Sequence, residues 1–151
     1  MSGTPTLRTG HIGLNVTDVD RSAAFYQRVL GLDPLGEGED GDRRWTFLGH
    51  DSELVLALWQ QASGRFPTEL AGLHHLSFQV DSRAEVDAAE EVLRALGAEF
   101  AYEGVVPHGE GAVSGGLFFT DPDGIRLEIY APTGADTAPA PVPTAPTCGF
   151  F

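Results

Sequence analysis

The sequence predicts an α+β fold made of two tandem copies of one strand–helix–strand unit. Two segments, "HIGLNV" (11–16) and "HLSFQV" (75–80), place a histidine ahead of alternating apolar residues. Each is followed by a helical pattern that ends in Leu-Gly. In addition, "FLGHDSELVLALW" (47–59) aligns without a gap with "FFTDPDGIRLEIY" (118–130). Similar segments that recur in the same order indicate a duplicated module.

The first copy begins with a strand at 11–16, whose apolar residues share one face. A helix follows, because Asp18 or Asp20 can cap its start and Gly31 stops it. "RRWTFLG" and "ELVLALWQ" predict two further strands joined by the turn "HDS", and the residues around Leu35 can add one more.

The second copy begins with the strand at 75–80 and continues with the helix "SRAEVDAAEEVLRALGAEF". Ser82 is the expected N-cap, Glu85 completes a capping box, and Gly97 ends the helix. "GLFFTDPDGIRLEIY" predicts a hairpin, because "DPDG" supplies turn residues between two apolar runs.

These elements divide the chain into three parts. Residues 1–8 are expected to form a flexible arm, and residues 9–131 a domain with one module at about 9–61 and the other at about 72–131. Residues 132–151, rich in Pro, Ala and Thr, predict a flexible tail. Its apolar tip, Phe150 and Phe151, could dock on another surface, or it could be an exposed end without a role.

Composition excludes several classes of function. The net charge of −13, with nine arginines and no lysine, argues against nucleic acid or anionic lipid as a partner and rules out Schiff-base chemistry. No apolar run is long enough to span a membrane, and the N-terminus lacks a secretory signal, so a cytoplasmic location is expected. The single cysteine permits no internal disulfide.

The alternation of the strands predicts a metal site. If the apolar face of each strand packs against the helices, then His11, His75 and Glu128 point into a common concavity from three strands. Two imidazoles and one carboxylate suit a divalent metal with positions left open for water, substrate or oxygen. Ala57 occupies the position equivalent to Glu128 in the first copy, so we expect three protein ligands.

Other polar residues could take part in the chemistry. His74 has the opposite parity to His75 and could orient it. His108, in the Gly-rich loop "PHGEGAVSGG", could act as an acid or base, or it could be an exposed loop residue. Arg126 faces inward, where it could contact a substrate anion or form an ion pair at the rim. The remaining inward residues are candidates for substrate binding: Asn15, Trp45, Phe47, Trp59, Ser77, Gln79, Phe118 and Tyr130.

Three segments, "HIGLNVTDVDRSAAFYQRVLGL", "LHHLSFQVDS" and "FFTDPDGIRLEIY", resemble the vicinal oxygen chelate superfamily. That superfamily includes glyoxalase I, extradiol dioxygenases, fosfomycin-resistance enzymes and metal-free bleomycin-resistance proteins. The resemblance implies a pair of βαβββ modules that form a partly closed, curved mixed sheet around a metal. It also implies the ligands His11, His75 and Glu128, and it places a possible fourth ligand of the family at Ala57.

Within the superfamily, "VPHGEGAVSGGLFFTDPDGIRLE" approaches the extradiol dioxygenase signature. His108 would be the signature histidine, followed by an intact "DPDG" and the ligand Glu128. The sequence departs from the signature in a slightly long spacer and in Phe118, which stands in place of a tyrosine. The resemblance favours Fe(II) and a ring-opening or other oxygenation of a small molecule, which could be aromatic, and Mn, Ni, Zn or Mg are alternatives.

Three other functions stay open at this point. One is a glyoxalase-like lyase or isomerase on the same metal, and another is a metal-free binding protein of the bleomycin-resistance kind. A third is a scaffold role through the "CGFF" tail. A fosfomycin-resistance activity is less favoured, because Arg126 is the one basic candidate inside the cavity. The resemblance also implies a homodimer.

Overall fold

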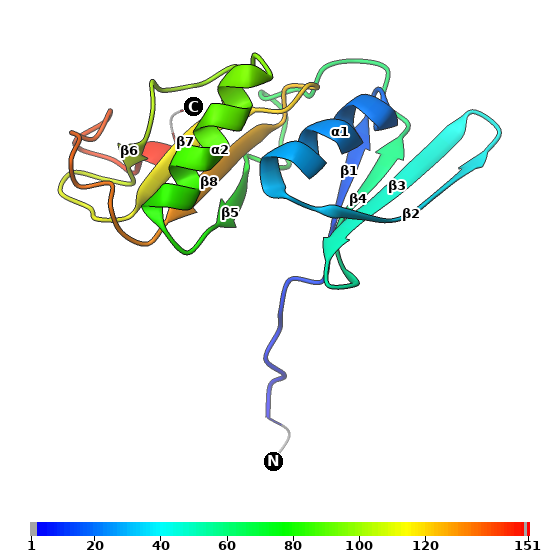
Figure 1. Ribbon diagram of the computed structural model, residues 1–151, viewed down its shortest axis with the longest axis horizontal. Helices are drawn as coiled ribbons and strands as arrows, with labels where there is room; N and C mark the ends of the chain where they lie inside the picture. The colour runs from blue at the N-terminus through cyan, green and yellow to red at the C-terminus, as the bar shows by residue number, and fades with distance from the viewer. Residues whose placement is uncertain (1–2, 150) are drawn as a thin grey trace. The chain divides into compact units, whose positions relative to one another are not determined.

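The chain forms two units with the same order of elements, from Met1 to Ser63 and from Gly64 to Phe151. The computed structural model describes residues 3–149 and 151, and Figure 1 shows both units. Each unit contains one four-stranded sheet and one α-helix, which confirms the predicted α+β fold. Residues 1 and 2 of the predicted arm and Phe150 of the tail lie outside the described residues.

The first unit contains five elements. Four of them begin and end within two residues of the segments predicted from the sequence. They are β1 (Ile12–Val16), α1 (Val19–Leu30), β2 (Asp33–Asp40), β3 (Arg43–His50) and β4 (Glu53–Gln60). The sheet order is β1-β4-β3-β2, with β1 parallel to β4 and the other pairs antiparallel. The exception is β2, of which only the neighbourhood of Leu35 was expected as a strand.

The predicted helix signals of the first unit are confirmed. Asp18 is the N-cap, and its carboxylate accepts a hydrogen bond of 3.0 Å from the backbone N–H of Arg21. Gly31 ends the helix at a φ of 64°, where a side chain would be strained. The apolar side of α1 packs on the sheet, over fully buried leucines of β3 and β4: Leu48, Leu56 and Leu58.

The second unit repeats this order. Its elements are β5 (Leu76–Gln79), α2 (Arg83–Ala95), β6 (Val106–Pro107), β7 (Gly115–Thr120), β8 (Arg126–Ala131) and the short 3₁₀ turn η1 (Thr147–Gly149). The sheet order is β5-β8-β7-β6, again with the first pair parallel and the others antiparallel. Helix α2 packs on β7 and β8 (Figure 1).

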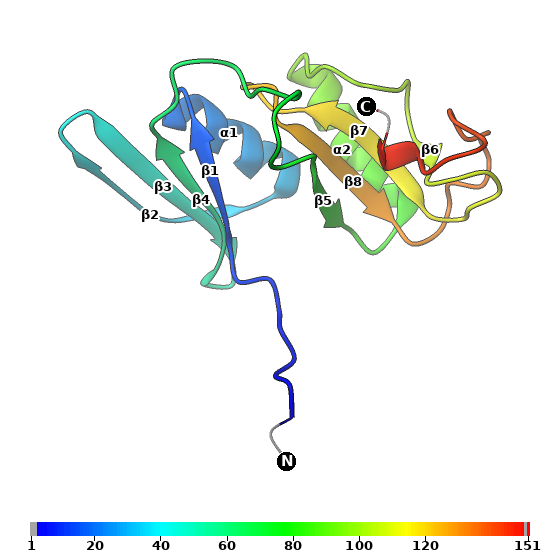
Figure 2. The same cartoon turned by 180° about the vertical axis from the view of Figure 1, so that it is seen from behind.

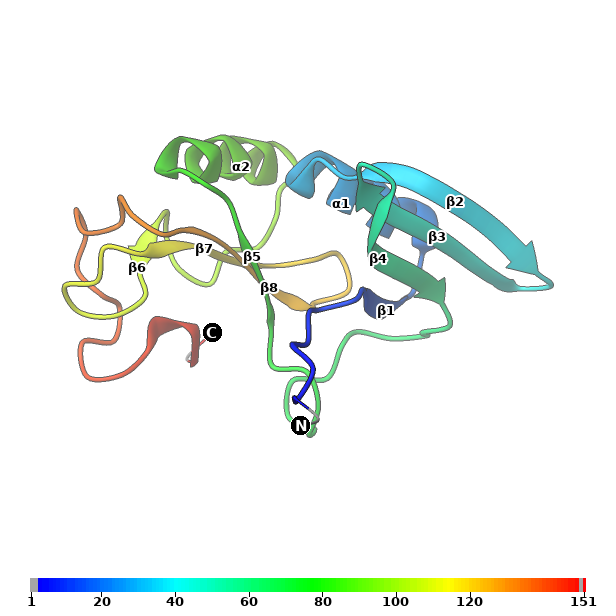
Figure 3. The same ribbon diagram turned by 90° about the horizontal axis from the view of Figure 1, so that it is seen from below.

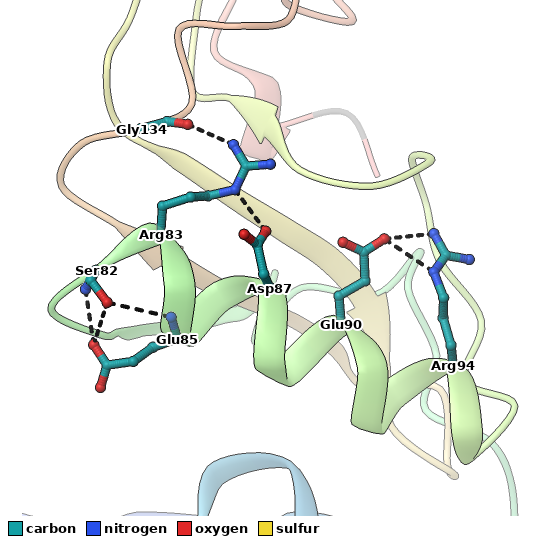
Figure 4. Close-up of polar contacts among 7 residues, drawn as sticks. All are labelled: Ser82, Arg83, Glu85, Asp87, Glu90, Arg94 and Gly134. Atoms are coloured by element: carbon teal, nitrogen blue, oxygen red, sulfur yellow. Dashed lines mark hydrogen bonds and ion pairs between the residues drawn. The ribbon is translucent and has the colours of Figure 1, made fainter.

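Helix α2 begins with the predicted capping box (Figure 4). The Ser82 hydroxyl accepts a hydrogen bond from the backbone N–H of Glu85, whose carboxylate accepts one of 2.9 Å from the N–H of Ser82. Arg83 in the first turn donates to Asp87 at 2.7 Å and to the carbonyl of Gly134 at 2.6 Å. The last contact ties the chain that follows β8 to the start of α2.

Strand pairing shows that the two copies are equivalent residue by residue. In the first unit Gly13 of β1 pairs with Ala57 of β4, and in the second Ser77 of β5 pairs with Glu128 of β8. These are the positions that the sequence alignment equated. The duplication inferred from sequence is therefore present in the backbone, and Ala57 stands where the second copy has a carboxylate. Among the described residues, no helix has the length and apolar character needed to cross a membrane.

Candidate functional site

A buried carboxylate lies at the centre of the candidate site in the second unit. Glu128 in β8 is only 3% exposed. Its Oε2 lies 3.5 Å from Nε2 of His75, and its Oε1 forms a short hydrogen bond with Nε2 of His108. The structure thus brings together three of the residues that the sequence predicted for the site.

The side chains around Glu128 share one face of the sheet, as the alternation predicted. Glu128 pairs with Ser77 of β5 and with Phe118 of β7, so these three side chains lie on the same side. Gln79 and Tyr130 are the next pair on that side, and the Tyr130 hydroxyl donates a hydrogen bond of 2.9 Å to the Gln79 side-chain oxygen. We call this surface the inner face of the second unit. The opposite face, formed by Leu127 and Ile129 among others, is buried.

His75 is held so that one ring nitrogen faces Glu128. Its Nδ1 lies 2.8 Å from Nδ1 of His74, a distance at which one ring donates a hydrogen bond to the other. Nε2 is then the nitrogen that remains for Glu128 or for a ligand. Burial lowers the pKa of His75, and the negative charge of Glu128 opposes this change. The neutral imidazole, which is the form that binds metals, is favoured.

His108 uses both ring nitrogens inside the protein. Nδ1 lies 2.9 Å from Oγ of Ser114, while Nε2 contacts Glu128. A carboxylate only accepts, so Nε2–H donates to Glu128 and the Ser114 hydroxyl donates to Nδ1 when the ring is neutral. The exposed-loop alternative for His108 does not apply here, because its side chain is 27% exposed and is anchored at both nitrogens. Sequence reasoning missed Ser114, since a loop has no periodicity that assigns its side chains to a face.

The tail after β8 also reaches this face. Thr147 is fully buried, and the ring of Phe151 lies 5.4 Å from that of His75, centroid to centroid. The Arg126 guanidinium lies 6.0 Å from the centre of the Phe151 ring, an arrangement typical of cation–π contact. Burial raises the pKa of the Cys148 thiol, and the negative charge of Glu128 raises it further.

The candidate residues of the first unit form an aromatic cluster. Trp45 and Trp59 are paired across β3 and β4 with ring centroids 6.1 Å apart, and Phe47 lies 5.8 Å from Trp59. Trp59 is 38% exposed, so the cluster offers an apolar surface to a ligand. The Asn15 side chain accepts a hydrogen bond of 3.0 Å from the backbone N–H of Gln61, which leaves its amide N–H groups for other partners.

His11 immediately precedes β1 and is exposed. It belongs to the first unit, whereas His75 and Glu128 belong to the second. Within residues 3–149 and 151, no three or more His, Cys, Asp or Glu side chains are gathered in a way that could hold a metal ion. The predicted convergence of His11 with the other two ligands therefore stays a prediction.

Two characterised relatives have different activities. Catechol-2,3-dioxygenase of Bacillus subtilis (strain 168) is 29% identical over 124 residues, which cover 81% of this chain and 40% of the dioxygenase. Lactoylglutathione lyase of Haemophilus influenzae is 33% identical over 131 residues, which cover 79% of this chain and 88% of the lyase. The chain thus spans less than half of the dioxygenase and most of the lyase.

A solved structure and a family model agree with these relatives. The fosfomycin resistance protein FosX of Listeria monocytogenes, complexed with Mn(II) and sulfate, has the same fold with a TM-score of 0.62 and 23% identity, over 84% of this chain and 93% of that chain. The model of the Glyoxalase/Bleomycin resistance protein/Dioxygenase superfamily matches residues 8–129. With a duplicated module, the expected strand order and a match over most of its length, the chain belongs to this superfamily.

Proposed function

We propose that the protein is a metal-dependent enzyme in which His11, His75 and Glu128 hold one divalent ion, with Fe(II) favoured. A small substrate would bind the ion through two neighbouring oxygens, and an extradiol-like ring opening is the favoured reaction. The observation that carries the proposal is the buried carboxylate of Glu128, with one oxygen toward Nε2 of His75 and the other toward His108. Burying a carboxylate is costly unless hydrogen bonds or a cation compensate; here one oxygen accepts a hydrogen bond from His108, and a cation between the other oxygen and Nε2 of His75 would compensate the charge further.

The donor set fits the group that the superfamily implies. His75 presents Nε2 because His74 occupies its Nδ1, and Glu128 presents Oε2 because His108 occupies its Oε1. Both donors are thus oriented by a second side chain, as is usual for metal ligands. A bound divalent ion would supply Lewis acidity toward the substrate oxygens, and Fe(II) would also give access to dioxygen.

The other residues of the site would bind and orient the substrate. Phe118 and Tyr130 flank Glu128 on the inner face, and the cluster of Trp45, Phe47 and Trp59 offers a second apolar surface. Apolar surfaces of this kind suit a planar ring. In the arrangement described above, His108 positions Glu128. An acid–base role for His108 would require its Nε2 to break the hydrogen bond to Glu128 and form one to a substrate hydroxyl instead.

A redox-neutral lyase on the same metal is the second candidate. It is favoured by the relative from Haemophilus influenzae, most of whose length the chain covers. A four-ligand metal site is not part of this proposal, because Ala57 has no donor atom and is 1% exposed.

Metal analysis of protein purified without chelator tests the proposal. We expect about one equivalent of metal in the wild type and its loss in His11→Ala, His75→Ala and Glu128→Gln. His50→Ala is the matched control, since His50 is the exposed last residue of β3 and its replacement should leave the metal content unchanged. Metal that persists in all three ligand variants would refute the proposed ligand set.

Activity assays separate the two reactions. The protein is loaded with Fe(II) under anaerobic conditions. It is then mixed with a panel of catechols in buffer that contains oxygen, and oxygen uptake is measured. Formation of lactoylglutathione from methylglyoxal and glutathione is followed in parallel with each metal. Oxygen uptake with a catechol supports the dioxygenase, and formation of lactoylglutathione without oxygen uptake supports the lyase. A metal-free protein that binds aromatic compounds tightly would favour the bleomycin-resistance kind of function instead. Light scattering of the same samples tests the expected homodimer.

A further inference from the structure

The segment that follows Pro146 lies against the inner face of the second unit. Figure 3 shows α2 on one side of the sheet and the 3₁₀ turn η1, in red, on the other, and Figure 2 shows η1 in front of the sheet near β7. The family model ends at residue 129, so the match to the superfamily does not include this segment. We call Thr147, Cys148, Gly149 and Phe151 the strap.

One end of the strap is fixed by hydrogen bonds around Thr147. Its hydroxyl donates to the carbonyl of Pro107 at 2.6 Å, and its backbone N–H donates to the carbonyl of His108 at 2.9 Å. Its own carbonyl accepts a hydrogen bond of 3.2 Å from the hydroxyl of Tyr102. Thr147 is fully buried, in contrast to its neighbour Thr144, which is exposed. A polar residue buried with all three groups satisfied indicates a specific docking position.

The other end of the strap covers residues of the candidate site. The Phe151 ring centroid lies 5.4 Å from that of His75, 5.0 Å from that of Phe118 and 6.2 Å from that of His74. Rings whose centroids are 4.5–7 Å apart are in direct contact. A substrate ring therefore has no room between Phe151 and His75. Between the two ends, Cys148 is half-buried.

We propose that the strap is an autoinhibitory element that covers the inner face of the second unit and must leave before a substrate reaches His75 and Glu128. The covering rests on the contacts of the strap alone, whereas its effect on substrate binding rests on the proposed function. If the strap is docked most of the time, the apparent affinity for a substrate equals the affinity of the open form multiplied by the fraction of molecules that are open. Any change that loosens the strap then strengthens substrate binding.

The chain contains a built-in reporter for docking, since Cys148 is its single cysteine. The rate of reaction of Cys148 with a disulfide reagent is measured on the full chain in EDTA, with circular dichroism to verify folding. We expect Thr147→Val to raise the rate about five-fold, which is the effect of one net hydrogen bond. Phe151→Ala, which leaves the bonds of Thr147 in place, should raise it as well. Thr144→Val is the matched control and should react like the wild type. Equal rates in all four proteins would overturn the docking of the strap.

The effect on ligands is tested with catechol as the probe. Zn²⁺ binding, and then catechol binding to the Zn²⁺-loaded protein, are measured by calorimetry for the wild type, Phe151→Ala and a chain that ends at Pro146. We expect similar Zn²⁺ affinity and at least several-fold tighter catechol binding in both altered proteins. Unchanged catechol affinity in both would overturn autoinhibition. If no protein binds Zn²⁺ while the thiol rates still differ, the covering is upheld and the proposed metal function fails, so the two failures are distinguishable.

Discussion

The contact between His108 and Glu128 allows a quantitative test that requires no substrate. Glu128 is 3% exposed, and one of its oxygens has His108 as its hydrogen-bond donor. A hydrogen bond to a charged group contributes about 1.5–3 kcal/mol, and a buried partner left unsatisfied loses that amount. We therefore expect His108→Leu to lower the free energy of unfolding of the metal-free protein by about 2 kcal/mol, which lowers Tm by roughly 4–8 °C in a chain of this length.

The double variant isolates the pair. Glu128→Leu alone leaves the ring nitrogen of His108 without its acceptor, and we expect a similar loss of about 2 kcal/mol. Replacing both residues by leucine leaves neither group unsatisfied, so the double variant should lose much less than the sum, with a coupling energy of about 1–3 kcal/mol.

The measurement is urea unfolding followed by far-ultraviolet circular dichroism, in EDTA so that metal binding makes no contribution. His50→Leu serves as the control, because replacing this exposed histidine at the end of β3 should change stability by less than about 0.5 kcal/mol. Losses that add within about 0.5 kcal/mol in the double variant would show that His108 and Glu128 do not interact in solution. The positioning role of His108 would then be wrong.

Three further predictions concern the fold. Ser82→Ala removes the capping box of α2 and should lower the free energy of unfolding by about 1 kcal/mol in urea denaturation. Gly116→Ala should destabilise by at least about 1–3 kcal/mol, because a Cβ there would overlap main-chain atoms of β8, whereas Gly109→Ala meets no neighbouring atom and should be nearly neutral in thermal melts. The Arg44 guanidinium, which donates two hydrogen bonds to Asp20, holds the pKa of that carboxyl below its usual 3.8. The folded state thus binds a proton at Asp20 less readily than the unfolded state does. The ion pair therefore contributes to stability above pH 3.8, and this contribution is lost as the pH falls through the lowered pKa. The free energy of unfolding of Asp20→Asn should fall less steeply than that of the wild type between about pH 4 and 2.

Most of the fold was predictable because its signals are local. The caps at Asp18 and Ser82 and the stop at Gly31 each depend on residues within one turn of the helix end. Strand β2 was only partly foreseen. Its sequence, "DPLGEGED", is acidic and Gly-rich, and it forms a strand because it pairs with β3. Strand β6 has two residues and is too short to show any alternation.

The candidate site was predictable only where it lies on strands. Alternation placed Ser77, Phe118 and Glu128 on one face, and the strand pairing agrees. It gave no information about Ser114 or Thr147, which lie outside the strands, because no repeating geometry links a loop residue to a face. The predicted flexibility of residues 132–151 stays a prediction, and the contacts of Thr147 show what a composition rich in Pro, Ala and Thr does not reveal.

Ala57 occupies the position in the first copy that Glu128 occupies in the second, so at this position the second copy has a carboxylate and the first has none. Ala57 is 1% exposed between Gly13 and Phe47 in its sheet, so a carboxylate introduced there would be cut off from solvent. Without a cation to compensate, that change would cost several kcal/mol, a substantial part of the stability of an ordinary domain. The first copy can therefore accommodate an acidic residue at this position only if an ion is already in place. Any chemistry that needs a buried carboxylate on this face falls to Glu128 in the second copy.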